Sequence, residues 1–176
     1  MSEKKEHYFI TYLKSLVEKD DRGALASLRR GLGQPPGITP EMYRYVIPYL
    51  PENPPKWQEQ SFYLIAALFA SHPKSTNKGN LGNHLANART EGNEQALERR
   101  FTALLSAHPD DLPDYLRQTI SLLKSKEVPV NWSELLYNLQ SWSHPKYGDV
   151  VRKKWAIGFW GYRSSEKEKP SENSEG

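Results

Sequence analysis

The side chains best suited to chemistry in this sequence are arginines and lysines that recur in short basic runs. Doublets stand at Arg29–Arg30 and Arg99–Arg100, Arg117 stands alone, and Arg152–Lys154 is a run of three. A guanidinium on a rigid helix presents a planar set of donors that matches phosphate oxygens. These residues therefore point to the holding of a phosphate backbone rather than to bond-making chemistry.

The position of each basic residue on its predicted helix decides whether it reaches a ligand. With the apolar residues of 97–104 turned inward, Arg99 falls on the opposite side and Arg100 at the flank. In the following segment Arg117 and Lys124 are seven residues apart and share the outer face. If the two helices form an antiparallel hairpin, a basic surface runs along them. A charged outer face is also what any solvated helix has, so both interpretations stay open.

Other basic residues have structural alternatives. Arg29 is close in angle to Leu25 and Leu32, so we expect a half-buried side chain whose guanidinium pairs with a carboxylate. Arg30 points further out, which favours ligand contact. On a helix, Arg152–Lys154 fan over about 200°, so they cannot all face one ligand.

Sequence signs of catalysis are weak. The chain has no cysteine, which excludes disulfides, zinc–thiolate sites and thiol catalysis. No pair of the five histidines has metal-ligand spacing near a carboxylate motif. The segment Gly79–Asn83 is glycine-rich but lacks the Gly-Lys-Ser/Thr ending and the preceding strand of a phosphate loop. We therefore expect a protein that is not an enzyme and that binds no cofactor or metal.

Composition bounds the class of protein. The 176 residues carry a net charge of +3 and 37% hydrophobic residues, which suits one water-soluble domain with a modest core. The longest apolar run, Phe62–Ala70, is too short to span a bilayer, and no signal peptide is apparent. We expect a cytoplasmic protein. Residues 1–161 are predicted to form one domain, and residues 162–176 a disordered charged tail.

Helical periodicity dominates the chain, and strand patterns are scarce. Apolar stripes, caps and Pro/Gly breaks predict an all-α, single-domain bundle of about eight or nine short helices. The segment from Lys56 to His72 is apolar nearly all round in its second half and is predicted to be the central buried helix. A short helix is expected around Asn83–Arg89. Asn131 with Glu134 resembles a capping box that opens a helix to Trp142.

Two further segments carry specific expectations. Thr39 and Pro40 form a strong helix start, with Tyr43, Val46, Ile47 and Leu50 on the buried side and Pro48 as a kink or early stop. Trp155 and Phe159 share a helical face with Val151 and are predicted core residues. Trp57 and Trp160 are candidates for an interface.

A series of short motifs occurs in a recognisable order along the chain. They are Leu28–Gly31, Tyr43, Ala67–His72, Gly79–Gly82, Glu98–Leu105, Leu116–Ile120, Val130–Trp132 and Trp155–Ala156. Together they resemble the CasB family, the small subunit of the type I-E CRISPR surveillance complex called Cascade. The resemblance covers about residues 8 to 160.

The resemblance implies an all-α protein without enzymatic activity, present as two copies in the inner belly of Cascade. Its expected role in antiviral defence is to help hold the guide-paired target strand and the displaced strand of the R-loop. Expected partners are the backbone and large subunits, a second copy of the chain, guide RNA, target DNA and displaced single-stranded DNA. No membrane contact is expected.

The resemblance also points to particular basic positions. Those that match the family's pattern are Arg29, Arg30, Lys56, Arg99, Arg100 and Arg117. Charge alone adds Lys124, Lys126, Arg152, Lys153 and Lys154. The alternative is a protein–protein scaffold in which the arginines pair with carboxylates of partners and touch no nucleic acid. A helix-turn-helix regulator is disfavoured because the segment Asn131–Trp142 is too apolar and aromatic for a recognition helix.

Overall fold

The computed structural model describes the backbone of residues 4–167 and the side chains of residues 4–161. This part of the chain contains nine α-helices. They are α1 (Tyr8–Glu18), α2 (Arg22–Arg29), α3 (Tyr43–Val46), α4 (Lys56–Ser71), α5 (Leu81–Asn87), α6 (Glu94–Leu105), α7 (Leu112–Ser125), α8 (Trp132–Ser141) and α9 (Tyr147–Lys167). The all-α class is confirmed. The tail expected at residues 162–176 lies outside the described residues, apart from the backbone of α9 as far as Lys167.

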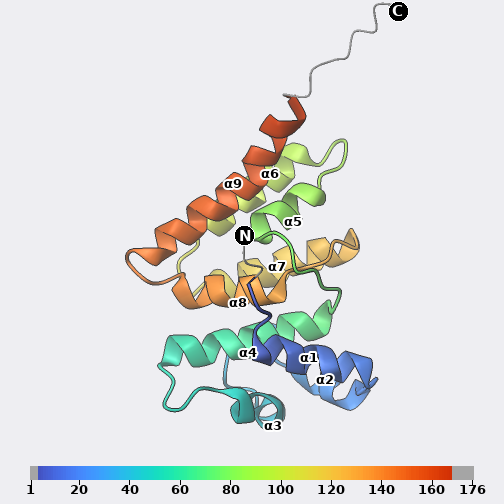
Figure 1. Cartoon of the computed structure of the whole chain (residues 1–176), viewed down its shortest axis with the longest axis vertical. Coiled ribbons are helices and arrows are strands. Elements are labelled where there is room, and N and C mark those ends of the chain that lie inside the picture. The colour runs from blue at the N-terminus through green and yellow to red at the C-terminus, as the bar shows by residue number, and fades with distance from the viewer. Residues whose placement is uncertain (1–3, 168–176) are drawn as a thin grey trace, which may run out of the picture.

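The helices are arranged in three tiers, with α1 to α4 in one, α7 and α8 in the next, and α5, α6 and α9 in the third (Figure 1). α4 contacts α2 and α3 on one side and α7 and α8 on the other. Nearly every residue from Ser61 to Ala70 is buried, because neighbours cover the helix from several directions. The expected central buried helix is confirmed.

Short 3₁₀ turns flank α3: η1 spans Pro40–Met42 and η2 spans Ile47–Tyr49. The break expected near Pro48 is present. Burial of Ile47 was a wrong expectation, since its side chain is 52% exposed. The α-helix ends at Val46 after about one turn, so the apolar stripe expected along a continuous helix to Leu50 does not form.

The third tier depends on close contact between α5 and α9. A Cβ added at Gly82 would overlap the carbonyl oxygen of Trp155, and one added at Gly158 would lie 2.7 Å from Asn80 Oδ1. Only residues without a side chain allow the two helices to approach so closely. Trp155 and Phe159 are buried beneath this contact, which confirms both as core residues.

Capping explains where α5 and α8 begin. Asn80 and Asn83 form a reciprocal capping box, so α5 begins at Leu81, two residues before the expected start. The Asn131 side chain accepts from Glu134 N at 3.1 Å, as expected. The other half of that box is absent: a Glu134 oxygen accepts from Asn138 Nδ2 at 3.2 Å instead of returning to the cap.

Candidate nucleic-acid interface

The two arginines at the end of α2 have different surroundings. Arg29 Nη1 donates to the carbonyl oxygen of Ala70 at 3.2 Å. That carbonyl belongs to the last turn of α4, where helix carbonyls lack an intrahelical partner and carry partial negative charge. The expected carboxylate partner of Arg29 is therefore replaced by a helix end. The expected half-burial was wrong, because Arg29 is exposed, as Arg30 is. Arg30 is exposed, and its Nη1 is 3.6 Å from Glu41 Oε1. An exposed pair of this kind is weak and readily exchanged for a ligand.

Arg117 projects from α7 towards the loop that follows α2. A Cβ added at Gly33 would lie 2.8 Å from Arg117 Nη1, so the guanidinium rests on the backbone of that loop. Arg117 Nη2 is 3.9 Å from Asp114 Oδ1, and both side chains are at least half exposed. The fold thus places Arg117 beside a turn only three residues beyond Arg30.

Arg99 and Arg100 lie on α6, and both are exposed. Neither guanidinium makes an ion pair within the described part of the chain. Arg100 lines a small recess at the seam with α7, together with Tyr115, Gln118 and Leu122. The placement of Arg99 outward and Arg100 at the flank is as expected.

The basic residues of α6 and α7 do not lie on one common face of the helix pair. On α7, Arg117 and Lys124 lie roughly 140° around the helix from the residues that border Arg100. The expected continuous basic surface along the hairpin is therefore not formed by these side chains. Arg100 and Arg117 occupy opposite flanks of α7.

The remaining lysines are dispersed. Lys124 and Lys126 are exposed at the end of α7. Lys56, also exposed, begins α4, and the rise of a helix puts it about 21 Å from Ala70, where Arg29 binds. Lys153 and Lys154 are exposed on α9.

Arg152 differs from its neighbours because it is engaged by the protein. Its guanidinium lies over the ring of Trp142, 4.4 Å from the centroid. Nη2 donates to the Trp142 carbonyl at 3.4 Å, and Nη1 is 3.6 Å from Asp149 Oδ1. These contacts favour a packing role over ligand binding.

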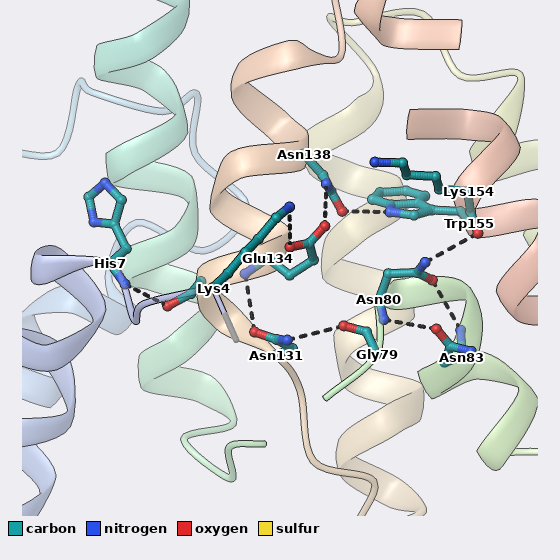
Figure 2. A network of polar contacts seen from close by, with 11 residues as sticks. Lys4, His7, Gly79, Asn80, Asn83, Asn131, Glu134, Asn138, Lys154 and Trp155 are labelled. Atoms are coloured by element: carbon teal, nitrogen blue, oxygen red, sulfur yellow. Dashed lines mark hydrogen bonds and ion pairs between the residues drawn. The ribbon is translucent and has the colours of Figure 1, made fainter. Parts of the chain in front are cut away.

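One groove is lined by lysines that are not among the basic residues predicted from the sequence. It has a volume of about 1030 Å³ and is lined by Lys4, Lys5 and Lys14 with amides and hydroxyls from the segment 75–80 and from α8. Figure 2 shows part of its wall, where Lys4 pairs with Glu134 at 3.2 Å and Asn131 Nδ2 donates to the Gly79 carbonyl. The adjacent lysines at positions 4 and 5 were the available sequence signal.

The buried histidines serve the fold. The pKa of His84 is lowered to about 4 by burial, and its Nε2 accepts a hydrogen bond from Asn131 N at 2.9 Å. His72 Nε2 is 2.7 Å from the Val128 carbonyl. No cluster of three or more metal-ligating side chains occurs among the described residues. None of the described helices is long and apolar enough to cross a membrane.

Comparison with known proteins identifies the family of this chain. Residues 24–160 match the family model described as CRISPR-associated protein Cse2. This chain belongs to the Cse2 family. A Cse2 protein of Thermus thermophilus is 34% identical over 168 residues, which are 93% of this chain and 95% of that protein.

Solved structures agree with the Cse2 assignment. CasB from Thermus thermophilus matches with a TM-score of 0.76 and 31% identity, over 87% of this chain and 96% of that one. CasB from M. ruber matches with a TM-score of 0.77 and 29% identity, over 93% and 98%. A chain of a CRISPR RNA-guided surveillance complex matches with a TM-score of 0.72 and 25% identity, over 90% and 99%. The resemblance to CasB seen in the sequence is confirmed.

Proposed function

We propose that this Cse2-family protein is a non-catalytic subunit of the CRISPR surveillance complex Cascade, in which it holds nucleic acid through exposed basic side chains. The observation that carries the proposal is the match along nearly the whole chain to Cse2 and CasB proteins and to a chain of a surveillance complex. The partners we propose are guide RNA, target DNA, the displaced strand, the backbone and large subunits, and a second copy. The cytoplasmic location stays a prediction.

The electrostatics suit this role. Exchange of a DNA duplex for a guide–target heteroduplex is nearly balanced in free energy, so modest contacts to the strand backbones can tip it. Arg30, Arg99, Arg100 and Arg117 are exposed, and the ion pairs of Arg30 and Arg117 are long. Such guanidiniums can bind phosphate at little cost in lost internal contacts. They offer no geometry for reading base edges, so we expect binding that is independent of sequence.

The arginines differ in position and in their contacts, and they are therefore proposed to have different roles. Because Arg100 and Arg117 lie on opposite flanks of α7, we propose that they contact separate stretches of nucleic acid. Arg29 and Arg152 have partners within the protein, so we assign them to the fold first. Lys56, Lys124, Lys126, Lys153 and Lys154 stay candidates of lower weight.

The test is binding of the purified chain to labelled single-stranded and duplex DNA and RNA across a salt series. Sequence-independent binding that falls steeply with salt is expected. For single strands, each lost phosphate contact should reduce the slope of log K against log salt by about 0.7, so Arg100→Ala with Arg117→Ala should reduce it by about 1.4.

A matched control is the pair Arg22→Ala with Arg44→Ala. It removes the same charge from exposed arginines outside the proposed set. Equal losses in the two double variants would mean that only net charge matters. Binding that does not respond to salt, or no binding even at low salt, would favour the scaffold role instead.

A further inference from the structure

A second surface has the opposite character from the basic one. A groove of about 360 Å³ lies between the loop 33–36, the first turns of α4, the start of α7 and the end of α8. Trp57, Gln60 and Leu64 line it from one face of α4, at the spacing of successive helical turns. Trp57 is 52% exposed, which is unusual for the largest apolar side chain.

The walls of this groove are rigid. Four prolines line it: Pro35, Pro36, Pro109 and Pro113. Proline has a fixed φ angle and little conformational freedom to lose, so a ligand would meet a surface already held in shape. Exposed tryptophan beside a preformed pocket is the usual composition of an interface hot spot.

The charge at the groove identifies its occupant. Asp110 and Asp114 line the groove, and their side chains are 89% and 70% exposed. Their partners are distant: His108 Nδ1 is 3.5 Å from Asp110, and Arg117 Nη2 is 3.9 Å from Asp114. Phosphate is repelled by such a rim, whereas a lysine or arginine is attracted.

Two copies of the groove are also unsuited to each other. A two-fold interface would bring the same patch together and oppose carboxylate to carboxylate. We infer that the Trp57 groove, formed by residues 33–36, Trp57–Leu64, Pro109–Asp114 and Leu139–Ser143, binds a segment of a different protein subunit. The segment carries an apolar or aromatic side chain next to a lysine or arginine. This inference rests on the proposed function, which makes the chain part of a multi-subunit complex.

The position of the groove links it to the basic surface. Gly33 lines the groove and lies against the guanidinium of Arg117. A subunit seated in the groove therefore comes to lie beside one of the proposed phosphate contacts. The chain would bind protein and nucleic acid across a single edge.

The first test measures incorporation of the chain into the purified complex after co-expression with the other subunits and guide RNA. Trp57→Ala should reduce incorporation about 30-fold, as expected for a hot-spot residue. Asp110→Lys with Asp114→Lys should also reduce it, whereas the matched control Glu18→Lys with Glu52→Lys, outside the groove, should not. Thermal unfolding of each variant establishes that it is folded.

The second test uses the absence of cysteine from the chain. Gln60→Cys gives a single thiol within the groove that can carry a benzophenone photocrosslinker, and Ile157→Cys gives a control thiol on α9. Crosslinking from position 60 to a lysine- or arginine-containing segment of another subunit is the expected result.

Crosslinks from position 60 to nucleic acid, to a second copy or to nothing would overturn the inference, as would normal incorporation of Trp57→Ala. Failure of the wild-type chain itself to join the complex would overturn the proposed function and the inference with it. The two failures are therefore distinguishable.

Discussion

Protonation of His84 should make the fold sensitive to acid. His84 lies in α5, 3% exposed, and its Nε2 accepts the backbone N–H of Asn131 just before α8 begins. Burial lowers its pKa from 6.5 to about 4. Above the ordinary pKa neither folded nor unfolded chain is protonated at this ring. As pH falls below 6.5, the His84 ring binds a proton in the unfolded chain but stays neutral in the folded chain, so the free energy of unfolding declines.

The size of the effect follows from the two pKa values. Each pH unit between them is worth about 1.4 kcal/mol, so complete titration removes about 3.5 kcal/mol of unfolding free energy. About 2 kcal/mol of this is lost between about pH 7.5 and pH 5, and the loss levels off below about pH 4. Such an effect is a large fraction of the stability of an ordinary domain.

The assay is chemical denaturation of wild type and His84→Gln at a series of pH values. Gln keeps an acceptor for Asn131 N but does not titrate, so the difference between the two curves isolates this ring. Burial also lowers the pKa of His7, but that contribution is common to both proteins and cancels. His84→Asn serves if Gln does not fold. Parallel pH dependences of variant and wild type would refute the reasoning.

Three further substitutions probe the fold around the interface. Gly82→Ala should destabilise by several kcal/mol, because the added Cβ overlaps the Trp155 carbonyl; a melting temperature equal to wild type would contradict this. Trp155→Phe should lower the free energy of unfolding by about 1–3 kcal/mol more than the lost volume alone, because Asn138 Oδ1 loses the hydrogen bond that it accepts from Trp155 Nε1 at 2.8 Å. The double variant Trp155→Phe with Asn138→Leu should regain part of that stability, and no regain would contradict this account. Arg29→Ala should lower the free energy of unfolding by about 1–2 kcal/mol and have little effect on nucleic-acid binding. If it weakens binding more than it weakens the fold, Arg29 is a nucleic-acid contact.

The sequence predicted the helices well where a single property determined them. The continuous apolar run of α4 required a buried helix, and the spacing of Val151, Trp155 and Phe159 required one inward face. The predicted burial of Ile47 was wrong because the α-helix stops at Val46, so no continuous helical stripe extends to Leu50. The start of α5 was placed too late because Gly82 reads as a breaker, whereas its missing side chain is needed against α9.

The candidate site was harder to predict, because it depends on how helices are oriented. Periodicity placed Arg99, Arg100 and Arg117 correctly on their own helices. It could not show which face of α7 packs against α6. Because the packed face is the one opposite Arg117, Arg100 and Arg117 lie apart. The partner of Arg29 could not be predicted either, because it is a backbone carbonyl, and the sequence does not show which helix end lies beside this arginine.

The central claim is tested most directly by target DNA binding to the purified surveillance complex that contains either wild type or Arg100→Ala with Arg117→Ala. The account predicts normal assembly and normal guide RNA content, with weaker capture of target DNA that deteriorates further as salt rises. Unchanged capture across the salt series by a fully assembled variant complex would contradict it.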